Sequence, residues 1–281
     1  MAELIAVRCE ACGGAVAWTA GKPAPACVFC GATALDTFTP PEGVEPPGGF
    51  LDFVVDEKAA RQLFRKRASD SIWYPSDLRH ARLELKAVLV PAWTWSARLE
   101  THYTAVVPGR TRSGKRPVAG TDEWPVEGVL VPSSPTLSRQ ELKEISPFEA
   151  SELRPLAEAA LPHELGSLTR TAARAQGEDG MGRAHQARLR ASLSASQVET
   201  ATIFHDLVGG PLLLPVWIGA YRRGEALHRV VVNGQTGAIT GSFPYSWWKI
   251  LLAVALVLGL ILLCTGGAGL AGILSQSPRR F

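Results

Sequence analysis

The sequence lacks the residue patterns of the common enzyme classes. None of its six histidines forms an HExxH pair, no GxSxG segment occurs, and no two carboxylates stand in a catalytic pattern. Residues 109–116 come near a phosphate-binding loop, but Arg116 stands where a Ser or Thr would ligate magnesium, and Pro117 follows where a helix would continue. We therefore predict a basic surface loop at 109–116 and a protein that is not an enzyme.

The sequence also lacks a strong excess of one charge. Its formal net charge is only +3 over 281 residues, and no basic or acidic tail marks a nucleic-acid partner. Asn233 is the only asparagine of the chain. The N-terminus lacks the basic and apolar segments of a signal peptide, because Glu3, Arg8 and Glu10 interrupt it. These absences predict an N-terminus in the cytosol.

Cysteine is scarce, yet four of the five cysteines lie in two CxxC pairs near the N-terminus: Cys9 with Cys12, and Cys27 with Cys30. A glycine follows each pair. Four thiolates at this spacing give a closed tetrahedral site, which predicts a structural Zn²⁺ in a zinc ribbon over residues 1–38; redox or iron–sulfur use of the pairs is the alternative.

The charge of the predicted ribbon bears on its partner. Residues 1–36 carry two basic side chains against three acidic ones, so the basic surface that phosphate contact needs is missing. This balance favours a protein partner over a nucleic acid for the ribbon.

Long apolar runs are absent except at the C-terminus. Residues Ile250 to Leu274 carry no charge and, as a helix, predict a single-pass membrane anchor; a buried core helix is the alternative. Trp247, Trp248 and Lys249 stand where interfacial residues belong. The anchor predicts contact with membrane lipid and an inner-membrane location, with the bulk of the chain in the cytosol. Small residues in the run suggest a helix-association face, and hence a homo-oligomer: Gly267, Ala268, Ala271 and Gly272.

The middle of the chain predicts a folded body at 50–245, after a linker rich in proline and glycine at 39–49. Residues 56–68 have helical spacing of apolar side chains. Residues 138–200 predict short helices, of which 184–198 is the longest, with a mobile glycine-rich loop at 175–182.

Two segments of β character share one pattern, an aliphatic residue and a proline followed by tryptophan. The first lies within 83–107 and the second within 212–241, and their likeness predicts two related β units that pair. Within the second unit, Asn233 and Gly234 predict a β-hairpin turn, because these residue types readily adopt positive φ. The predicted fold class is α+β, made of zinc ribbon, linker, body, membrane helix at 247–274 and a short tail at 275–281.

Taken together, the segments resemble a bacterial family of membrane-anchored zinc-ribbon proteins. The matching residues are the CxxC pairs, the segment Phe53 to Arg61, Val90-Pro-Ala-Trp93, Leu214-Pro-Val-Trp217 and Val232-Asn-Gly-Gln-Thr-Gly237. Such proteins are often labelled transcription factor IIB-type zinc ribbons or relatives of the primosomal replication-restart helicase. The resemblance implies an adaptor role beside a band-7-like membrane scaffold or a phage-shock-type protein.

These patterns predict a non-catalytic adaptor or scaffold that recruits protein partners to the cytosolic face of a membrane. The alternative is a membrane-tethered nucleic-acid-binding protein of replication or transcription. That alternative would need phosphate contacts from two clusters of basic residues in the body. The first is Arg61, Arg65, Lys66, Arg67, Arg79 and Arg82, and the second is Arg110, Arg112, Lys115 and Arg116.

Overall fold

The architecture was examined in a computed structural model of the chain. The structure describes residues 4–10, 15–19, 27, 32–37, 42–109, 114–150, 153–158, 163–224 and 226–274. Within these ranges, the side chains of 4–6, 16–19, 260 and 262–274 are not described.

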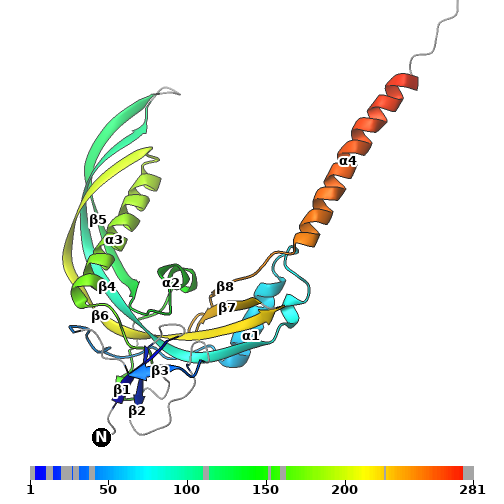
Figure 1. Cartoon of the computed structure of the whole chain (residues 1–281). Helices are drawn as coiled ribbons and strands as arrows, with labels where there is room; N and C mark the ends of the chain where they lie inside the picture. Colours follow the sequence, from blue (N-terminus) through cyan, green and yellow to red (C-terminus); the bar gives the residue numbers. More distant parts are fainter. Residues whose placement is uncertain are drawn as a thin grey trace, which may run out of the picture.

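The described chain is mostly β, with 42% in strands and 29% in helices, which corrects the predicted α+β class. A five-stranded antiparallel sheet in the order β5-β4-β6-β7-β8 curls into a half-barrel, and α4 projects from one end of it (Figure 1). The elements, in chain order, are β1 (Leu4–Cys9), β2 (Ala15–Thr19), β3 (Leu35–Thr37), α1 (Glu57–Ser69), η1 (Leu78–His80), β4 (Leu83–Pro108), β5 (Lys115–Pro132), α2 (Arg139–Ile145), η2 (Leu156–Glu158), α3 (Arg170–Ser192), β6 (Gln197–Arg223), β7 (Ala226–Asn233), β8 (Ile239–Gly241) and α4 (Trp247–Leu274).

The two segments with the shared proline and tryptophan pattern pair with each other at the centre of the sheet. Leu89 lies opposite Pro215, and Pro91 lies opposite Leu213, in the long antiparallel ladder of β4 and β6. A proline offers no N–H to a ladder, so it is tolerated where its nitrogen points away from the paired strand. The Pro215 carbonyl accepts the Gly234 N–H at 2.8 Å, so the backbone of Pro215 points toward the turn after β7 and away from β4. The predicted pairing of the two units is therefore confirmed.

The sheet turns sharply near the middle of its longest strands. The β4–β5 ladder shifts register between Trp95 and Ala97, and the β4–β6 ladder shifts between Ser96 and Arg98. Bulges at one level in two adjacent ladders bend both, because each adds an unpaired residue and increases the local twist. The half-barrel therefore bends at the level of Ser96.

Helix α1 confirms the helix predicted at 56–68. Asp56 is its N-cap, and the Asp56 carboxylate accepts a 2.7 Å hydrogen bond from the Ala59 N–H. Ala60 and Phe64, which are buried, face Tyr221 and Val230 of the sheet. The N-cap and the spacing of apolar residues both favour a helix at this place, and the packing of its apolar face against the sheet agrees with them.

The hairpin predicted around Asn233 is confirmed, but its turn differs from the predicted one. Val232 of β7 lies opposite Ile239 of β8, and the Asn233 N–H donates to the Ala238 carbonyl at 2.8 Å. The residue with positive φ is Gly237, at +76°, and not Gly234. Position 234 requires glycine for a different reason, because an added Cβ would lie 2.6 Å from the Phe53 ring.

Helix α3 corrects the prediction of a mobile loop at 175–182 and of a helix at 184–198. It runs without a break from Arg170 to Ser192, through three glycines, while Val198 belongs to β6. Gly177 is buried, and a Cβ added there would lie 2.7 Å from Trp95. Close approach of the helix to the Trp95 ring therefore outweighs the low helix propensity of glycine.

The described part of the predicted linker packs against the body. Glu45 forms an ion pair with Arg170 at 2.6 Å, and the Gly48 N–H donates to the Pro211 carbonyl at 2.9 Å. A Cβ added to Gly49 would lie 2.5 Å from the Arg154 carbonyl oxygen. The glycines and prolines of this segment thus allow close packing along β6.

The N-terminal segment corrects the predicted zinc ribbon. Its described residues form a three-stranded antiparallel sheet in the order β2-β1-β3, with Cys9 and Cys27 buried. A metal needs several ligands in one place, and no three His, Cys, Asp or Glu side chains gather in this way among the described residues. Cys12 and Cys30 lie outside the described residues, so the four-cysteine ligand set stays a prediction.

Helix α4 corrects the predicted membrane anchor and the inner-membrane location that depended on it. In the part of the chain whose side chains are described, no helix is long and apolar enough to cross a membrane. The side chains of the predicted association face and of Leu274 lie outside the described residues.

The glycines of α3 offer a paired test of this packing. Gly182→Ala should stabilise the protein by up to about 1 kcal/mol, because a Cβ there meets open space and alanine favours the helix. Gly177→Ala should destabilise it by about 2 kcal/mol, because the added methyl overpacks against Trp95. Urea unfolding of both variants measures the difference, and equal effects at the two positions would contradict the packing described.

Candidate functional site

A cleft of about 900 Å³ lies beside α2, at the level where the sheet bends. We call it the α2 cleft. It is bounded by α2 and the loop that follows it, by the edge of β5 and by Gly180 and Ala184 of α3. Its apolar lining comes from Val129, Leu130, Pro132, Leu142, Pro147 and Phe148.

The outer edge of β5 is open where it borders the α2 cleft. The Ser133 N–H donates to the Pro91 carbonyl at 3.0 Å, which makes the adjacent pair, Ala92 and Pro132, a non-hydrogen-bonded pair of the ladder. Two residues earlier, Leu130 has the same orientation, so its backbone N–H and C=O point away from β4. Within the described residues no other strand pairs with β5. The α2 cleft therefore contains backbone groups able to pair with an added strand.

Prolines interrupt the edge of β5 further from the cleft. Pro117 and Pro125 lie opposite Val106 and Arg98 of β4. Neither proline can donate a backbone hydrogen bond, and proline at an edge discourages pairing with other chains. The stretch from Gly128 to Pro132 is thus the part of the edge where the α2 cleft presents a backbone N–H.

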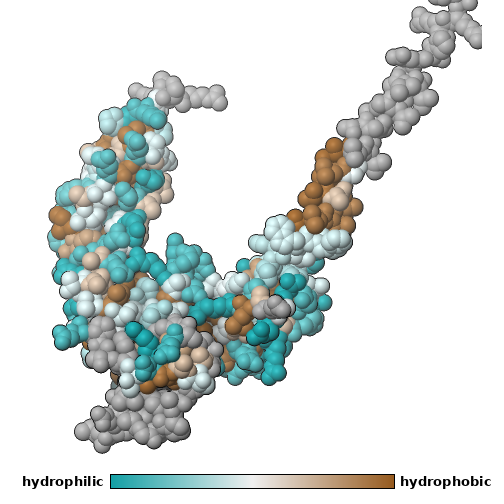
Figure 2. All heavy atoms as spheres, in the orientation of Figure 1, coloured by the Kyte–Doolittle hydropathy of each residue, from teal (hydrophilic) through white to brown (hydrophobic). Residues whose placement is uncertain are grey.

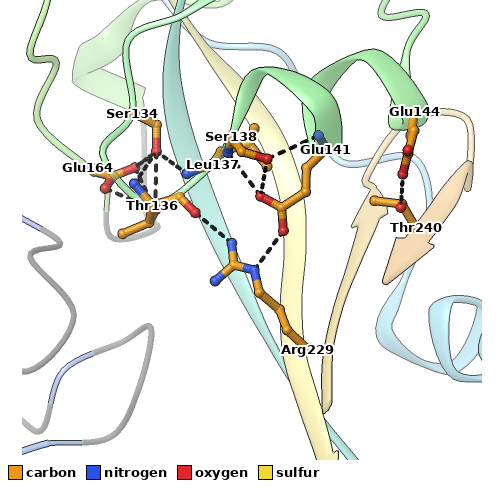
Figure 3. Close-up of polar contacts among 9 residues, drawn as sticks. All are labelled: Ser134, Thr136, Leu137, Ser138, Glu141, Glu144, Glu164, Arg229 and Thr240. Atoms are coloured by element: carbon orange, nitrogen blue, oxygen red, sulfur yellow. Dashed lines mark hydrogen bonds and ion pairs between the residues drawn. The ribbon is translucent and has the colours of Figure 1, made fainter. Parts of the chain in front are cut away.

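Charged side chains of both signs line the α2 cleft without ion pairs. Arg139 and Lys143 lie one turn apart on α2, while Glu127 comes from β5 and Glu149 from the loop after α2. Arg139 donates a hydrogen bond to the amide oxygen of Gln176, and Lys143 has no polar partner among the described residues. The carboxylates of α2 itself turn to other partners, as Figure 3 shows for Glu141 and Glu144.

A helix of seven residues such as α2 needs tertiary contacts to persist. The fully buried Asn233 supplies them at the C-terminal end. Its amide nitrogen donates to the carbonyls of Ile145 and Pro147, at 2.7 and 2.9 Å, and its amide oxygen accepts from the N–H groups of Gln235 and Thr236. Asn233 thus joins the hairpin turn to the end of α2, using its whole hydrogen-bonding capacity.

At the N-terminal end of α2, a buried carboxyl group holds the preceding loop. The Ser134 and Thr136 hydroxyls donate to the Glu164 carboxylate (Figure 3). The Glu164 N–H donates to the Leu89 carbonyl. Burial raises the pKa of Glu164 to about 7, although the two hydroxyls and Arg229 act to lower it. Burial dominates because the charged form loses its hydration there.

Two further contacts fix α2 against the hairpin. Arg229 of β7 donates to Glu141 at 2.8 Å and to the Thr136 carbonyl at 2.7 Å, while the Thr240 hydroxyl donates to Glu144 (Figure 3). Ser138 and Glu141 complete a capping box at the start of the helix. The wall of the α2 cleft is therefore tied to the sheet through side chains from β7 and β8.

A second cluster of buried polar side chains has the geometry of a hydroxyl nucleophile beside a histidine base and a carboxylate. His185 of α3 lies 2.8 Å from the Thr101 hydroxyl and 2.8 Å from the Asp122 carboxylate. Thr101 is fully buried, and its hydroxyl also lies 2.9 Å from that of Thr202. These residues do not line the α2 cleft, so they serve to fasten α3 to β4, β5 and β6.

Among the predicted site residues whose side chains the structure describes, none lines the α2 cleft. Lys249 donates to the carbonyls of Ile72 and Tyr74, at 3.0 and 2.7 Å, and thereby ties the base of α4 to the body. Beyond it, α4 presents a strongly apolar surface (Figure 2). The side chains that are more than half exposed there are Trp247, Trp248, Leu251, Leu252, Val254, Leu256, Val257, Leu258 and Ile261.

The near match to a phosphate-binding loop at 109–116 lies at the turn between β4 and β5, where the Gly109 N–H donates to the Gly114 carbonyl at 2.7 Å. A phosphate-binding loop joins a strand to a helix, so this arrangement agrees with the rejection of that function. Residues 110–113 lie outside the described residues.

Sequence reasoning missed Glu164, His185 and the α2 cleft. A weak signal for the cleft wall was present in Ser138-Arg-Gln-Glu141, which matches the capping-box pattern before an apolar residue. Nothing in the spacing of Ser134, Thr136 and Glu164 indicates that they meet, because two elements of the chain separate them in sequence.

Comparison with known proteins adds no relative. No family model, no curated protein and no solved structure matches the chain. The resemblance to membrane-anchored zinc-ribbon proteins, and the partners that it implies, therefore stay predictions.

The raised pKa of Glu164 predicts a pH dependence of stability. The folded protein binds this proton more tightly than the unfolded chain, so the contribution is full below about pH 4.5 and is lost as the pH rises through 7. Between pH 4 and pH 8.5, wild type should lose about 3 kcal/mol of unfolding free energy relative to Glu164→Gln, which cannot ionise. Urea unfolding across this pH range measures the loss. If the unfolding free energies of wild type and Glu164→Gln change in parallel with pH, the raised pKa of Glu164 is contradicted.

The amide of Asn233 should be among the most costly to remove. Asn233→Ala leaves the carbonyls of Ile145 and Pro147 without their donor, and should lower the unfolding free energy by about 3 kcal/mol. Gln140→Ala, which removes an exposed side chain from the same helix, serves as the control and should cost less than about 0.5 kcal/mol. Similar losses for the two variants would show that Asn233 does not hold α2.

Proposed function

We propose that this protein is a non-catalytic adaptor that binds a segment of another protein in the α2 cleft. The observation that carries the proposal is the composition of the cleft, which combines an apolar lining, an open strand edge and charges without ion pairs. Apolar depressions with a few polar groups at the rim are the usual form of a recognition site.

The positions of the reactive side chains support a function without catalysis. The groups best suited to acid–base or nucleophilic chemistry, Glu164, His185 and Thr101, are fully buried and take part in hydrogen bonds that join elements of the fold. None of them lines the α2 cleft.

The exposed apolar surface of α4 also favours an attachment function. Large exposed apolar patches mark interaction sites, and α4 is fixed to the body at its base by Lys249. A protein with a recognition cleft and a separate apolar attachment surface has the properties of an adaptor.

For the nucleic-acid alternative, neighbouring carboxylates offset part of the first basic cluster of the body. Arg61 pairs with Glu57, Arg67 with Asp70 and Arg82 with Glu84. Carboxylates beside half of the cluster reduce the positive potential that phosphate contact would need.

Position-specific crosslinking in cells tests the proposal. A photoreactive side chain at position 180, in the α2 cleft, should give a discrete covalent adduct with a second protein, whereas one at position 182 should not, because Gly182 lies outside the cleft on the same helix. Both variants keep α3 intact, since neither glycine has a close neighbour at its added Cβ. Equal adducts at both positions, or none at 180, would contradict the adaptor function.

A further inference from the structure

We propose that the α2 cleft binds an extended peptide segment that adds a short strand to the edge of β5 and places one acidic side chain against Arg139 and Lys143. This inference rests on the proposed adaptor function and specifies the chemistry of the segment. It has three supports: the orientation of the backbone at Leu130, the two apolar walls and the charge of α2.

The backbone supplies the first support. Leu130 directs both its N–H and its C=O outward, and a peptide residue opposite it can accept and donate one hydrogen bond each. Addition of a strand to an exposed edge is a recurring way to bind a peptide, in which main-chain bonds give affinity and pockets for alternate side chains give specificity. Pro125 limits the added strand on one side, because it has no N–H to offer.

The two walls supply the second support. Leu130 packs with the cluster under α2 that includes Leu142 and Phe148, whereas Val129 packs with the cluster under α3 that includes Trp95 and Met181. Successive side chains of an added strand point to opposite faces, so they would alternate between these two walls. At the α3 wall, Gly180 and Ala184 leave room, since a Cβ added to Gly180 lies 4.0 Å from Val129.

Charge supplies the third support. Arg139 and Lys143 face the cleft from one side of α2 and have no ion-pair partner among the described residues. The acidic residues of α2 are occupied elsewhere, Glu141 by Arg229 and Glu144 by Thr240. A carboxylate in the bound segment would therefore meet two cations that have no ion-pair partner among the described residues, and charge-assisted hydrogen bonds are stronger than neutral ones.

The remaining charges limit how acidic the segment can be. Glu127 and Glu149 line the same cleft and have no ion-pair partner among the described residues. A run of acidic residues would bring like charges together there, at an energetic cost. The preferred segment thus carries a single acidic residue flanked by aliphatic ones.

A peptide-display selection against the purified full-length chain tests this chemistry. The selection should enrich peptides that carry one Asp or Glu beside Val, Ile or Leu. Counter-selection against the Gly180→Trp variant should remove peptides that bind elsewhere on the protein. Failure to enrich any peptide, or enrichment of peptides without an acidic residue, overturns the inference.

Matched variants then test each contact with the best enriched peptide. Lys143→Glu should weaken binding by about tenfold or more, while the same change at Lys115, on β5 outside the cleft, should not. Leu130→Pro should abolish the strand pairing, while Ala119→Pro, at an outward-facing edge position outside the cleft, should leave it intact. The unfolding free energy of each variant establishes that it is folded.

The possible outcomes separate the two proposals. If Gly180→Trp removes binding but Lys143→Glu and Leu130→Pro do not, the cleft binds by apolar contact alone, which overturns the inference and leaves the adaptor function in place. If Leu130→Pro instead converts a dimer of the chain to a monomer, the occupant of the edge is a second copy, and the inference is again wrong. Absence of the crosslinked adduct at position 180 in cells would contradict the adaptor function itself.

Discussion

The antiparallel pairing of β4 with β6 is the constraint on which the rest of the structure depends. It runs from Leu83 opposite Tyr221 to Val106 opposite Gln197, so it joins residues more than 90 positions apart in the sequence along almost the whole length of both strands. β5 attaches to β4 and β7 attaches to β6, while β8 joins the sheet through β7. The bulges near Ser96 bend the pair, and the α2 cleft lies at the level of this bend.

The cleft exists only because a short helix is held beside that edge. Helix α2 is too short to be stable alone, and its position comes from buried polar side chains together with the burial of Leu142 and Ile145. Asn233 satisfies two backbone carbonyls at one end, and Glu164 joins the loop at the other. Such groups specify geometry strongly, because each is costly to bury without its partners.

Local patterns predicted the parts of the fold in which sequence neighbours cooperate. Helix α1 was predictable because its cap, Asp56, and its apolar face lie within a few residues. The hairpin of β7 and β8 and the pairing of the proline and tryptophan segments were predictable for similar reasons. The candidate site was not, because Ser134, Glu164 and the β7 residues Arg229 and Asn233 come from three separate parts of the chain, and no spacing rule connects them.

The sequence by itself determined where helices and strands of strong local character lie, because propensity, capping and turn chemistry act over short distances. Tertiary structure alone decided that α3 continues through Gly177, since only the nearby ring of Trp95 gives that glycine its advantage. It also decided which face of α2 meets the cleft and which edge of β5 stays open. Those outcomes depend on contacts between distant segments, and such contacts exist only once β4 and β6 have paired.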